Sequence, residues 1–452
     1  MFYGREKEVE IIKEFSNKEN QALMLYGKRK VGKTTLLKEA LKDRKYVYYE
    51  CIKSTLKDNV LNFVDTLIDY KVINYKINFD SFQDVFKFLN TLNLKLDIII
   101  DEFPYLKIFE KSETIDSIFQ SIIDNYLTNI TLYISGSHNG MMKSMLEEKN
   151  ALYGRFNTII KLNELNYIEI SSFYKSLKPY DKIAFYSVFS GSPFINSFID
   201  ENKTLKENII DIILNKNSTV FNYAENLLMS DLSNSVNAER ILFAIANGKK
   251  KYNEIESKLG LNNNGLLSKQ LNVLLDMEIV KKVYPINQKE DRKKAYYEIN
   301  DNLLRFYYAY IYKNKSQLEL LGPNTFYSNY IENSIDTFIS HRFEEICRSY
   351  FSLEAKKGML KGILDIGTFY YDNPVTKNNG EFDVALKFED YYDIYECKYY
   401  KSNIKVSEMI LEESQIKLIK GLKINKIGFI NASNQDERLE QFNYIDGSDL
   451  YK

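Results

Sequence analysis

Short, mainly apolar, strand-like runs recur along the first third of the chain, and segments with helical periodicity separate them. The runs stand at 22–26, 46–49, 96–100, 131–135 and 157–162. Runs of this kind are typical of parallel strands that are buried on both faces. The segment 59–69, between two of them, has the spacing of a helix. The pattern predicts an α/β fold built around a parallel sheet.

A glycine-rich segment connects the first of these runs to a helix-like stretch. It reads G-K-R-K-V-G-K-T, a complete G-x-x-x-x-G-K-T phosphate-binding loop in the strand–loop–helix context that the motif requires. Its glycines let backbone N–H groups point inward at a helix N-terminus that favours anions, while Lys33 reaches the outer phosphates and Thr34 holds Mg²⁺. A chance glycine–lysine turn is the alternative, and the motif downstream argues against it. We expect a nucleoside triphosphate to contact Gly27, Lys28, Arg29, Lys30, Val31, Gly32, Lys33, Thr34 and Thr35.

The apolar run at 96–100 ends in two adjacent carboxylates, Asp101 and Glu102. We expect Asp101 to hold Mg²⁺, directly or through water, and Glu102 to polarise the water that attacks the terminal phosphate. An adjacent Asp–Glu pair can also be a solvent-exposed strand end. Its place on a buried strand that follows a phosphate loop favours the catalytic interpretation.

Polar residues near the ends of the last two runs are further candidates. The strand at 131–135 is followed by Ser137, His138 and Asn139, any one of which is a candidate sensor of the γ-phosphate. A plain turn explains any single one of them equally well. Arg155, just before the run at 157–162, is a candidate arginine finger for the nucleotide of a neighbouring subunit, or else a surface cation. The finger would require a homo-oligomer, which the sequence does not establish.

These motifs together resemble the archaeal-type ATPases of the AAA+ and STAND-like P-loop class. The resemblance rests on the phosphate loop and on Y-G-R-E-K-E at 3–8, D-E-F-P-Y-L at 101–106, S-G-S at 135–137, Y-G-R at 153–155 and G-S-P at 191–193. It implies ATP as the nucleotide, and a helical lid at 166–235 whose Pro193 lies close to that nucleotide. Ser192 stands where the family more often has a second glycine.

The segment 236–302 has three short helical stretches, a glycine between the second and third, and two short strands. This order is typical of a winged helix-turn-helix, and 12 basic against 8 acidic residues at 236–300 favour DNA binding through phosphate contacts. A rigid spacer or a protein-docking module is the alternative. The residues expected to face DNA are Asn262, Asn263, Ser268, Lys269 and Gln270 on the third helix and Lys289, Arg292, Lys293 and Lys294 in the wing.

The segment 303–452 contains the pattern D-x(12)-E-x-K on two successive strand-like stretches. Glu396 and Lys398 are two residues apart on one strand and therefore share a face, and Asp383 lies on the preceding strand. The two carboxylates suit Mg²⁺, and the lysine suits the positioning of a water for phosphodiester hydrolysis. A chance E-x-K on an exposed strand is the alternative.

This constellation resembles the PD-(D/E)xK nuclease superfamily, and the whole chain resembles archaeal-type ATPases that carry such a domain at the C-terminus. The resemblance adds Glu344, on a preceding helix, to the metal ligands Asp383 and Glu396. The tryptophan-bearing strand common in that module is replaced here by residues 367–371. Because many such modules look degenerate, a folded but inert domain remains the alternative.

Composition narrows the classes of protein further. The length of 452 residues suits about three domains, and 61 basic residues nearly balance 62 acidic ones, so any nucleic-acid surface must be a local patch. The three cysteines, Cys51, Cys347 and Cys397, are too far apart in sequence for a disulfide framework or a zinc site. With no signal-like start and no apolar run near the ~20 residues of a membrane span, we expect a cytoplasmic protein without membrane contact.

The sequence thus predicts four domains: an ATPase core at 1–165, the lid at 166–235, the winged helix at 236–302 and the nuclease-like domain at 303–452. The favoured function is an ATP-hydrolysing protein that binds DNA and cuts it at a metal-dependent C-terminal site. The alternative is a non-nucleolytic, ATP-controlled switch or scaffold with an inert C-terminal domain. A DNA-binding regulator with a vestigial ATPase is disfavoured by the intact Lys33, Thr34, Asp101 and Glu102.

Overall fold

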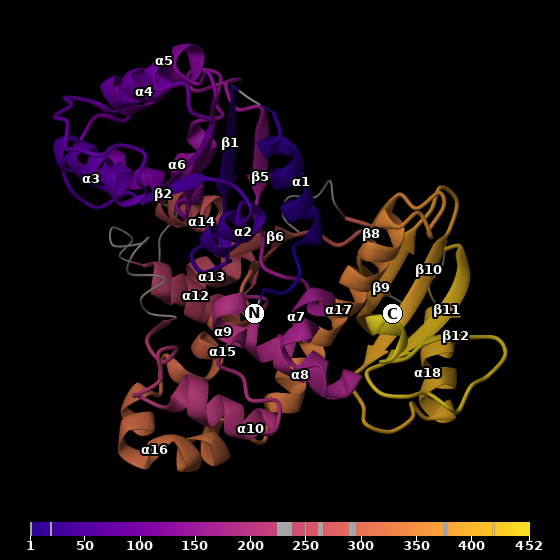
Figure 1. Ribbon diagram of the computed structural model, residues 1–452. Helices are drawn as coiled ribbons and strands as arrows, with labels where there is room; N and C mark the ends of the chain where they lie inside the picture. The colour runs from indigo at the N-terminus through magenta and orange to yellow at the C-terminus, as the bar shows by residue number, and fades with distance from the viewer. Residues whose placement is uncertain are drawn as a thin grey trace. The chain divides into compact units, whose positions relative to one another are not determined.

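The computed structural model divides the chain into two compact units (Figure 1). The first contains Met1–Leu165 and Ser192–Phe194, and the second contains Asn166–Gly191 and Ile195–Lys452. The structure describes residues 2–18, 20–223, 237–248, 250–260, 265–288, 295–373, 378–417, 419 and 421–452. The predicted DNA contacts Asn262, Asn263, Lys289, Arg292, Lys293 and Lys294 lie outside the described residues.

The first unit is built on a five-stranded sheet in which every pairing is parallel. The strands run in the order β2 (Tyr46–Glu50), β3 (Leu96–Asp101), β4 (Ile130–Gly136), β1 (Gln21–Tyr26), β5 (Thr158–Lys161). All residues of β3 and β4 are buried. The prediction of an α/β fold with a parallel sheet is therefore confirmed, because the apolar runs are strands covered on both faces.

Two hydrophobic cores lie on the two faces of this sheet. Along β1, Ala22 and Met24 belong to one core while Leu23 and Leu25 belong to the other, as alternation along a strand requires. The second core includes residues of α1 and α2, and the first includes residues of α3 to α6. These helices are α1 (Glu6–Ser16), α2 (Lys33–Ala40), α3 (Leu56–Asp69), α4 (Phe82–Thr91), α5 (Ser112–Asn125) and α6 (Asn139–Ser144). A 3-10 helix spans Phe103–Lys107.

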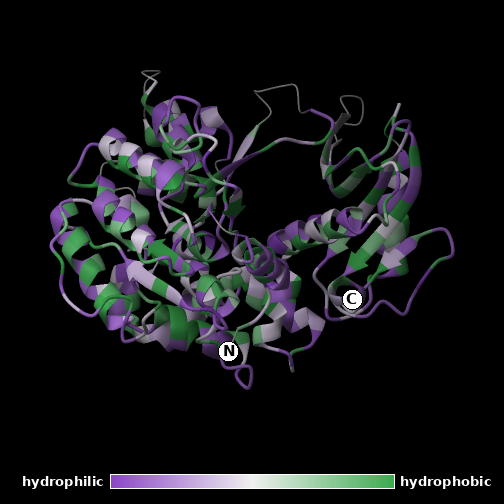
Figure 2. Ribbon diagram, turned by 45° about the horizontal axis from the view of Figure 1, so that its top comes forward, coloured by the Kyte–Doolittle hydropathy of each residue, from purple (hydrophilic) through white to green (hydrophobic). Residues whose placement is uncertain are grey.

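The second unit opens with helices and a two-stranded antiparallel ribbon. Figure 2 shows hydrophobic and hydrophilic residues interspersed along the helices of the chain. The early helices are α7 (Tyr167–Ile170), α8 (Pro179–Phe189) and α10 (Leu205–Asn208), which continues as a π-helix over Ile209–Leu214; α9 (Pro193–Asn196) begins in the first unit. They are followed by α12 (Ala238–Ala246), α13 (Tyr252–Leu259), α14 (Leu266–Asp276), β6 (Val280–Val283) and β7 (Tyr296–Ile299).

Three helices lead from the ribbon to the C-terminal sheet: α15 (Asn302–Phe306), α16 (Lys315–Tyr330) and α17 (Ile335–Lys356). A glycine–proline pair is typical of a chain break, and here Gly322 and Pro323 form a kink that joins two helical segments of α16. Gly322 has a φ of 72°, which glycine adopts without a Cβ penalty, and the kink accommodates the proline that follows. The helix expected to carry Glu344 is α17, which extends from Ile335 to Lys356.

The C-terminal sheet is mixed and has the order β12-β11-β10-β9-β8. Its strands are β8 (Asp365–Asn373), β9 (Asn378–Lys387), β10 (Tyr392–Lys398), β11 (Ile424–Asn431) and β12 (Asn443–Ile445). The first three pair antiparallel and the last three pair parallel. Helix α18 (Val406–Lys417) connects β10 to β11. No helix in the described part of the chain is both long and apolar enough to cross a membrane.

Candidate functional site

The phosphate loop connects the carboxyl end of β1 to the N-terminus of α2, which begins at Lys33. Gly32 has a φ of 98°, and a Cβ at Gly27 would lie 2.2 Å from the carbonyl oxygen of Leu162, so both positions require glycine. The Lys33 side chain is buried, and its Nζ donates to the carbonyl oxygens of Gly27 at 2.9 Å and Lys28 at 3.0 Å. Burial lowers the pKa of Lys33. The ammonium is thus held at the mouth of the loop.

Asp101, at the carboxyl end of β3, lies beside the loop and accepts hydrogen bonds from three hydroxyl groups. The Thr34 Oγ1 donates at 2.6 Å and the Tyr48 hydroxyl at 2.9 Å to one carboxylate oxygen, and the Ser135 hydroxyl donates to the other. Thr34 and Asp101 are therefore adjacent hard oxygen donors at the end of the sheet. This is the donor set that Mg²⁺ prefers beside nucleotide phosphates.

Glu102 follows directly and is held in a fixed orientation. Its backbone has a φ of 50°, an uncommon conformation for a residue other than glycine. One carboxylate oxygen accepts from the Ser137 Oγ at 2.7 Å and from the Ser137 backbone N–H at 3.3 Å. The structure thus brings Ser137 to Glu102, whereas the nearby His138 side chain caps α6 by accepting from the Met141 N–H at 3.3 Å.

The G-S-P element at 191–193 contributes two residues that lie against the phosphate loop within the first unit. The Ser192 Oγ donates to the carbonyl oxygen of Lys30 at 3.3 Å, and a Cβ built on Gly32 would lie 3.9 Å from the Pro193 ring. The Lys30 Nζ lies 3.5 Å above the ring of Phe194. Serine in place of the family's glycine therefore supplies a polar contact with the loop.

Arg155 lies at the opposite end of the strands from the phosphate loop. The loop follows the carboxyl end of β1, whereas Arg155 precedes β5, which runs parallel to β1. Its Nε donates to both carboxylate oxygens of Asp124 at 3.1 Å. The arginine finger remains a prediction, since it depends on a second copy of the chain.

Sequence reasoning missed the hydroxyl groups that orient Asp101. Tyr48 and Ser135 are on β2 and β4, the two strands that flank β3 in the sheet. Their positions in the sequence gave a partial indication, because polar residues near the carboxyl ends of parallel strands lie at the same end of the sheet. Only the strand order shows that both lie next to Asp101. Arg29 was predicted as a nucleotide contact, and here its Nη2 donates to the Tyr105 hydroxyl at 2.7 Å.

A second cluster of charged residues lies in the C-terminal sheet. Asp383 is on β9 and Glu396 and Lys398 are on β10, next to each other in the sheet. The Lys398 Nζ donates to a Glu396 oxygen at 2.8 Å, and an Asp383 oxygen accepts from the Cys397 N–H at 2.8 Å. Glu396 and Lys398 thus point to the same side of the strand, as the spacing predicted.

The electrostatics of this cluster are dominated by burial and by repulsion between its carboxylates. Burial raises the pKa of Asp383 well above its usual range, and the charges of Glu396 and Glu344 add to the rise. Burial likewise raises the pKa of Glu396 to about 7, although Lys398 opposes the rise. The carboxylates raise the pKa of Lys398 against the effect of its burial. Such perturbed groups are concentrated at functional sites, although structural clusters also show them.

Glu344 on α17 has different neighbours. One of its carboxylate oxygens lies 3.2 Å from the His341 Nδ1, and the other lies 3.9 Å from the Arg348 guanidinium. Arg348 also donates to the backbone carbonyl of Asp383 at 2.6 Å. Within the described residues, no group of three or more His, Cys, Asp or Glu side chains is arranged to hold a metal ion.

The predicted DNA-facing residues that the structure describes lie on α14. Ser268 and Lys269 are exposed, and Gln270 is half-buried. The antiparallel ribbon β6–β7 follows α14 in sequence, and the Tyr297 N–H donates to the Lys250 carbonyl at 2.9 Å, which fixes the ribbon to the start of α13. The exposed residues of α14 thus belong to a packed group of helices and strands that includes α13 and the β6–β7 ribbon.

Comparison with known families identifies the class of the first unit. Residues 2–194 match a family described as an ATPase domain found predominantly in Archaea, and the phosphate loop, Asp101 and Glu102 lie within this match. The chain is therefore an ATPase with a P-loop nucleotide site. Residues 307–410 match a second family, described as archaeal and bacterial proteins of unknown function.

Individual proteins resemble most of the chain. An uncharacterized protein of Methanocaldococcus jannaschii is 27% identical over 361 residues, which cover 77% of each chain. The Walker-type ATPase of Pyrococcus abyssi has a solved structure that is similar with a TM-score of 0.52 and 18% identity, over 68% of this chain and 96% of that one. The ORC2 protein of Aeropyrum pernix gives a TM-score of 0.46 and 13% identity, over 70% and 95%. The likeness to the Pyrococcus abyssi structure concerns the fold.

Proposed function

We propose that the chain is a Mg²⁺-dependent ATPase that binds DNA and cuts it at its C-terminal sheet. The observation that carries the cutting activity is the adjacency of Asp383, Glu396 and Lys398 on β9 and β10. The ATPase activity follows from the first unit, and the remaining parts of the proposal concern the second.

In the first unit, each residue has a distinct role. The backbone N–H groups of residues 27–34 and the Lys33 ammonium bind the β- and γ-phosphates. Thr34 and Asp101 would hold Mg²⁺, which neutralises charge on those phosphates. Glu102, oriented by Ser137, accepts a proton from the attacking water. Lys33 then faces negative phosphate oxygens in place of the two carbonyls that it contacts here.

In the second unit, α12, α13, α14 and the β6–β7 ribbon would form a winged helix-turn-helix that holds DNA. The exposure of Ser268 and Lys269 on α14 supports this role. Contacts of this kind with phosphates give binding that weakens as salt concentration rises.

The donor chemistry of the C-terminal cluster fits a divalent cation. Asp383 and Glu396 are two buried carboxylates whose pKa values are raised chiefly by burial, with the charge of Glu396 adding to the rise at Asp383. A bound cation would favour the charged form of both groups. Mg²⁺ usually takes only one or two carboxylates and completes its shell with water and substrate phosphates. When bound, it would polarise the phosphodiester and acidify a water. Lys398, released from Glu396, would orient that water toward phosphorus.

Cleavage of DNA by purified protein with Mg²⁺ or Mn²⁺ tests the proposal. Lys398→Ala should abolish cutting. The control is Lys417→Ala, which should cut normally, because Lys417 is an exposed lysine on α18 that pairs with Glu413. Cutting that persists undiminished in Lys398→Ala would refute the assignment.

A second candidate function is a non-nucleolytic switch, in which ATP controls the docking of DNA or protein. It is favoured by one observation: no group of three ligand side chains in the described residues is arranged to hold a metal. Wild-type protein that hydrolyses ATP but cuts no linear, nicked or branched DNA would establish this alternative over the first.

A further inference from the structure

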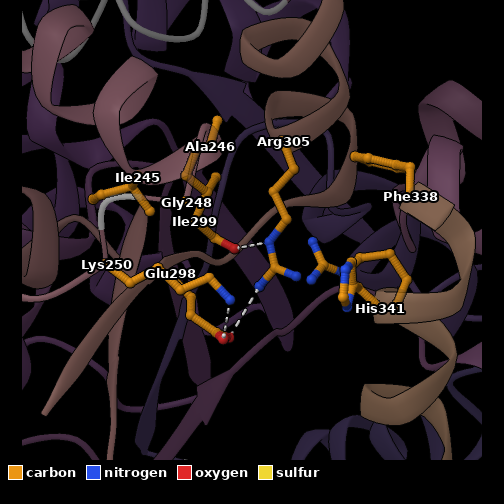
Figure 3. A pocket seen from close by; sticks show the side chains of 10 residues that line it. Ile245, Ala246, Gly248, Lys250, Glu298, Ile299, Arg305, Phe338 and His341 are labelled. Atoms are coloured by element: carbon orange, nitrogen blue, oxygen red, sulfur yellow. Dashed lines mark hydrogen bonds and ion pairs between the residues drawn. The ribbon is translucent and has the colours of Figure 1, made fainter. Parts of the chain in front are cut away.

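A cavity of about 300 Å³ lies in the second unit, and the residues that line it come from α12, β7, α15 and α17 and from the segment before α13 (Figure 3). This volume is at the lower end of the range for small-molecule sites. One part of its wall is apolar, with Ile245, Ile299 and Phe338. Another part is charged, with the cations Lys250, Arg305 and Arg342 and the carboxylate Glu298. None of its lining residues belongs to the phosphate loop or to the set Asp383, Glu396 and Lys398.

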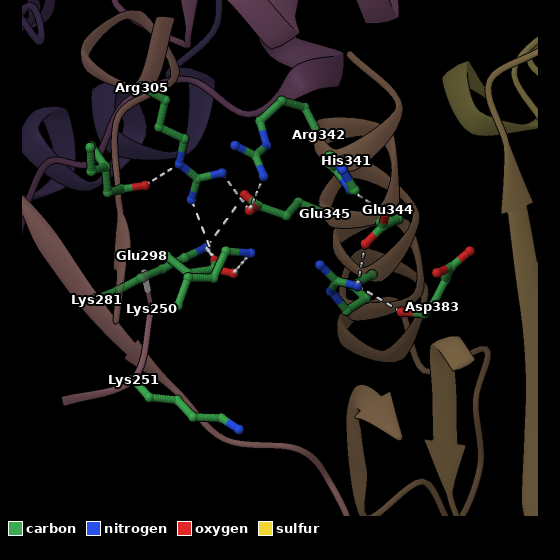
Figure 4. Close-up of polar contacts among 12 residues, drawn as sticks. Lys250, Lys251, Lys281, Glu298, Arg305, His341, Arg342, Glu344, Glu345 and Asp383 are labelled. Carbon is green, nitrogen blue, oxygen red and sulfur yellow. Dashed lines mark hydrogen bonds and ion pairs between the residues drawn. The ribbon is translucent and has the colours of Figure 1, made fainter. Parts of the chain in front are cut away.

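The charged wall belongs to a network of ion pairs. Glu345 lies 2.6 Å from the Arg305 guanidinium, 3.4 Å from the Lys281 ammonium and 3.7 Å from the Arg342 guanidinium. Glu298 lies 3.4 Å from Arg305, 3.5 Å from Lys281 and 3.8 Å from Lys250. Four cations therefore surround two carboxylates (Figure 4).

The two arginines differ in how well their donors are satisfied. The Arg305 Nε donates to the backbone carbonyl of Ile299, and its two Nη atoms reach Glu345 and Glu298. The Arg342 side chain is only 13% exposed, and its buried Nε has no hydrogen-bond partner among the residues that the structure describes. A buried guanidinium N–H without an acceptor is costly, because its water has been lost and not replaced.

The charges around Arg342 likewise favour the binding of an anion. Burial and the neighbouring charge of Arg305 lower the pKa of Arg342 to about 10. The network has two more cations than carboxylates, and a phosphate monoester carries −1.5 to −2 charges at neutral pH. Guanidinium groups bind phosphate oxygens in a bidentate manner. A phosphate here would accept hydrogen bonds from Arg342 and would reduce the repulsion between the charges of Arg305 and Arg342.

We propose that this cavity binds a small phosphomonoester, with the phosphate on Arg342, Arg305 and Lys250 and the apolar body of the molecule against Phe338 and Ile245. The proposal does not depend on the nuclease assignment. In this proposal Arg342 binds the ligand. Without ligand, its buried Nε lacks an acceptor among the described residues, which lowers the stability of the fold.

The test measures the thermal unfolding midpoint of the full chain with inorganic phosphate, with adenosine monophosphate, and with short DNA strands bearing a 5′-phosphate or a 5′-hydroxyl. It is done in the Lys33→Ala background, because the phosphate loop would otherwise bind the same probes. We expect phosphate and adenosine monophosphate to raise the midpoint.

Arg342→Met should weaken the apparent affinity for adenosine monophosphate by about 10- to 100-fold, the range for one charge-assisted contact. The control is Arg438→Met, which should leave the affinity unchanged. Arg438 is an exposed arginine elsewhere in the unit and pairs with Asp446. The unliganded Arg342→Met protein should unfold at the same temperature as its parent or above it, which separates lost binding from lost folding.

Three results would overturn the proposal. One is the absence of stabilisation by any probe, and another is equal stabilisation of the parent and Arg342→Met. The third is stabilisation only by the 5′-phosphorylated strand, which would assign the cavity to a nucleic-acid end instead of a small molecule.

Discussion

Glu102 combines an uncommon backbone conformation with a carboxylate held by Ser137. A φ of 50° costs free energy in a residue that has a Cβ, and such strain persists only where the surrounding structure imposes it. Here the conformation directs the carboxylate to Ser137, next to the pair Thr34 and Asp101. The residue is thus held in place before nucleotide binds.

Glu102→Gln should bind ATP normally and hydrolyse it about 10²- to 10⁴-fold more slowly, because the amide keeps the shape but accepts no proton. Measuring both the affinity for ATP and kcat separates the two effects. Lys33→Ala, by contrast, should lose binding itself. Hydrolysis at the normal rate by Glu102→Gln would exclude Glu102 as the base.

Tyr48→Phe should raise the Mg²⁺ concentration needed for half-maximal hydrolysis by about tenfold, the value of one hydrogen bond to a charged group. The lost hydroxyl donates to Asp101 at 2.9 Å. A magnesium titration of ATPase activity measures the effect, with Tyr46→Phe on the same strand as the control. An unchanged titration would mean that Thr34 and Ser135 orient Asp101 without Tyr48.

At the scale of elements, the strands of the first unit were predictable because they are covered on both faces and read as apolar runs. The kink at Gly322 was not, since glycine and proline indicate a break without distinguishing a loop from a bend in one helix. The position of the phosphate loop was also predictable, because one local motif contains it. The surroundings of Arg342 were not, because they combine α15, α17 and β7, which are separated in sequence.

A buried ion pair connects the 3-10 helix at 103–107 to α5. The Lys107 Nζ lies 2.5 Å from an Asp116 oxygen, and both side chains are almost fully buried. Lys107→Met should lower the free energy of unfolding by about 3–5 kcal/mol, because Asp116 would remain buried without its cation. Adding Asp116→Leu should recover much of the loss. Denaturant unfolding measures both, and a double variant as unstable as the single one would contradict this account.

Helix α14 carries the prediction about DNA. Lys269→Ala should weaken binding equally for all sequences and reduce the slope of log affinity against log salt by about 1, as for one lost phosphate contact. Lys258→Ala on α13 serves as the control. Binding isotherms at several salt concentrations measure the slope. An unchanged slope for Lys269→Ala would direct the search for a DNA surface away from α14.

At the scale of the whole molecule, the chain joins two units with different chemistry. The first has a parallel sheet with a nucleotide site at the carboxyl ends of its strands, and the second has a mixed sheet with paired carboxylates and a lysine. The overall charge of −1 gives the chain no strong electrostatic field, so the proposed binding of nucleic acid would depend on local groups. ATP hydrolysis and the proposed cutting of DNA depend on different residues, so single substitutions should separate them.

The most direct measurement follows ATP hydrolysis and DNA cleavage in parallel for wild type, Glu102→Gln and Lys398→Ala. We expect Lys398→Ala to hydrolyse ATP at the wild-type rate without cutting DNA, and Glu102→Gln to lose hydrolysis while its C-terminal cluster stays intact. Cutting by wild type that survives in Lys398→Ala, or the absence of cutting by wild type on every DNA, would contradict a nuclease site at β9 and β10.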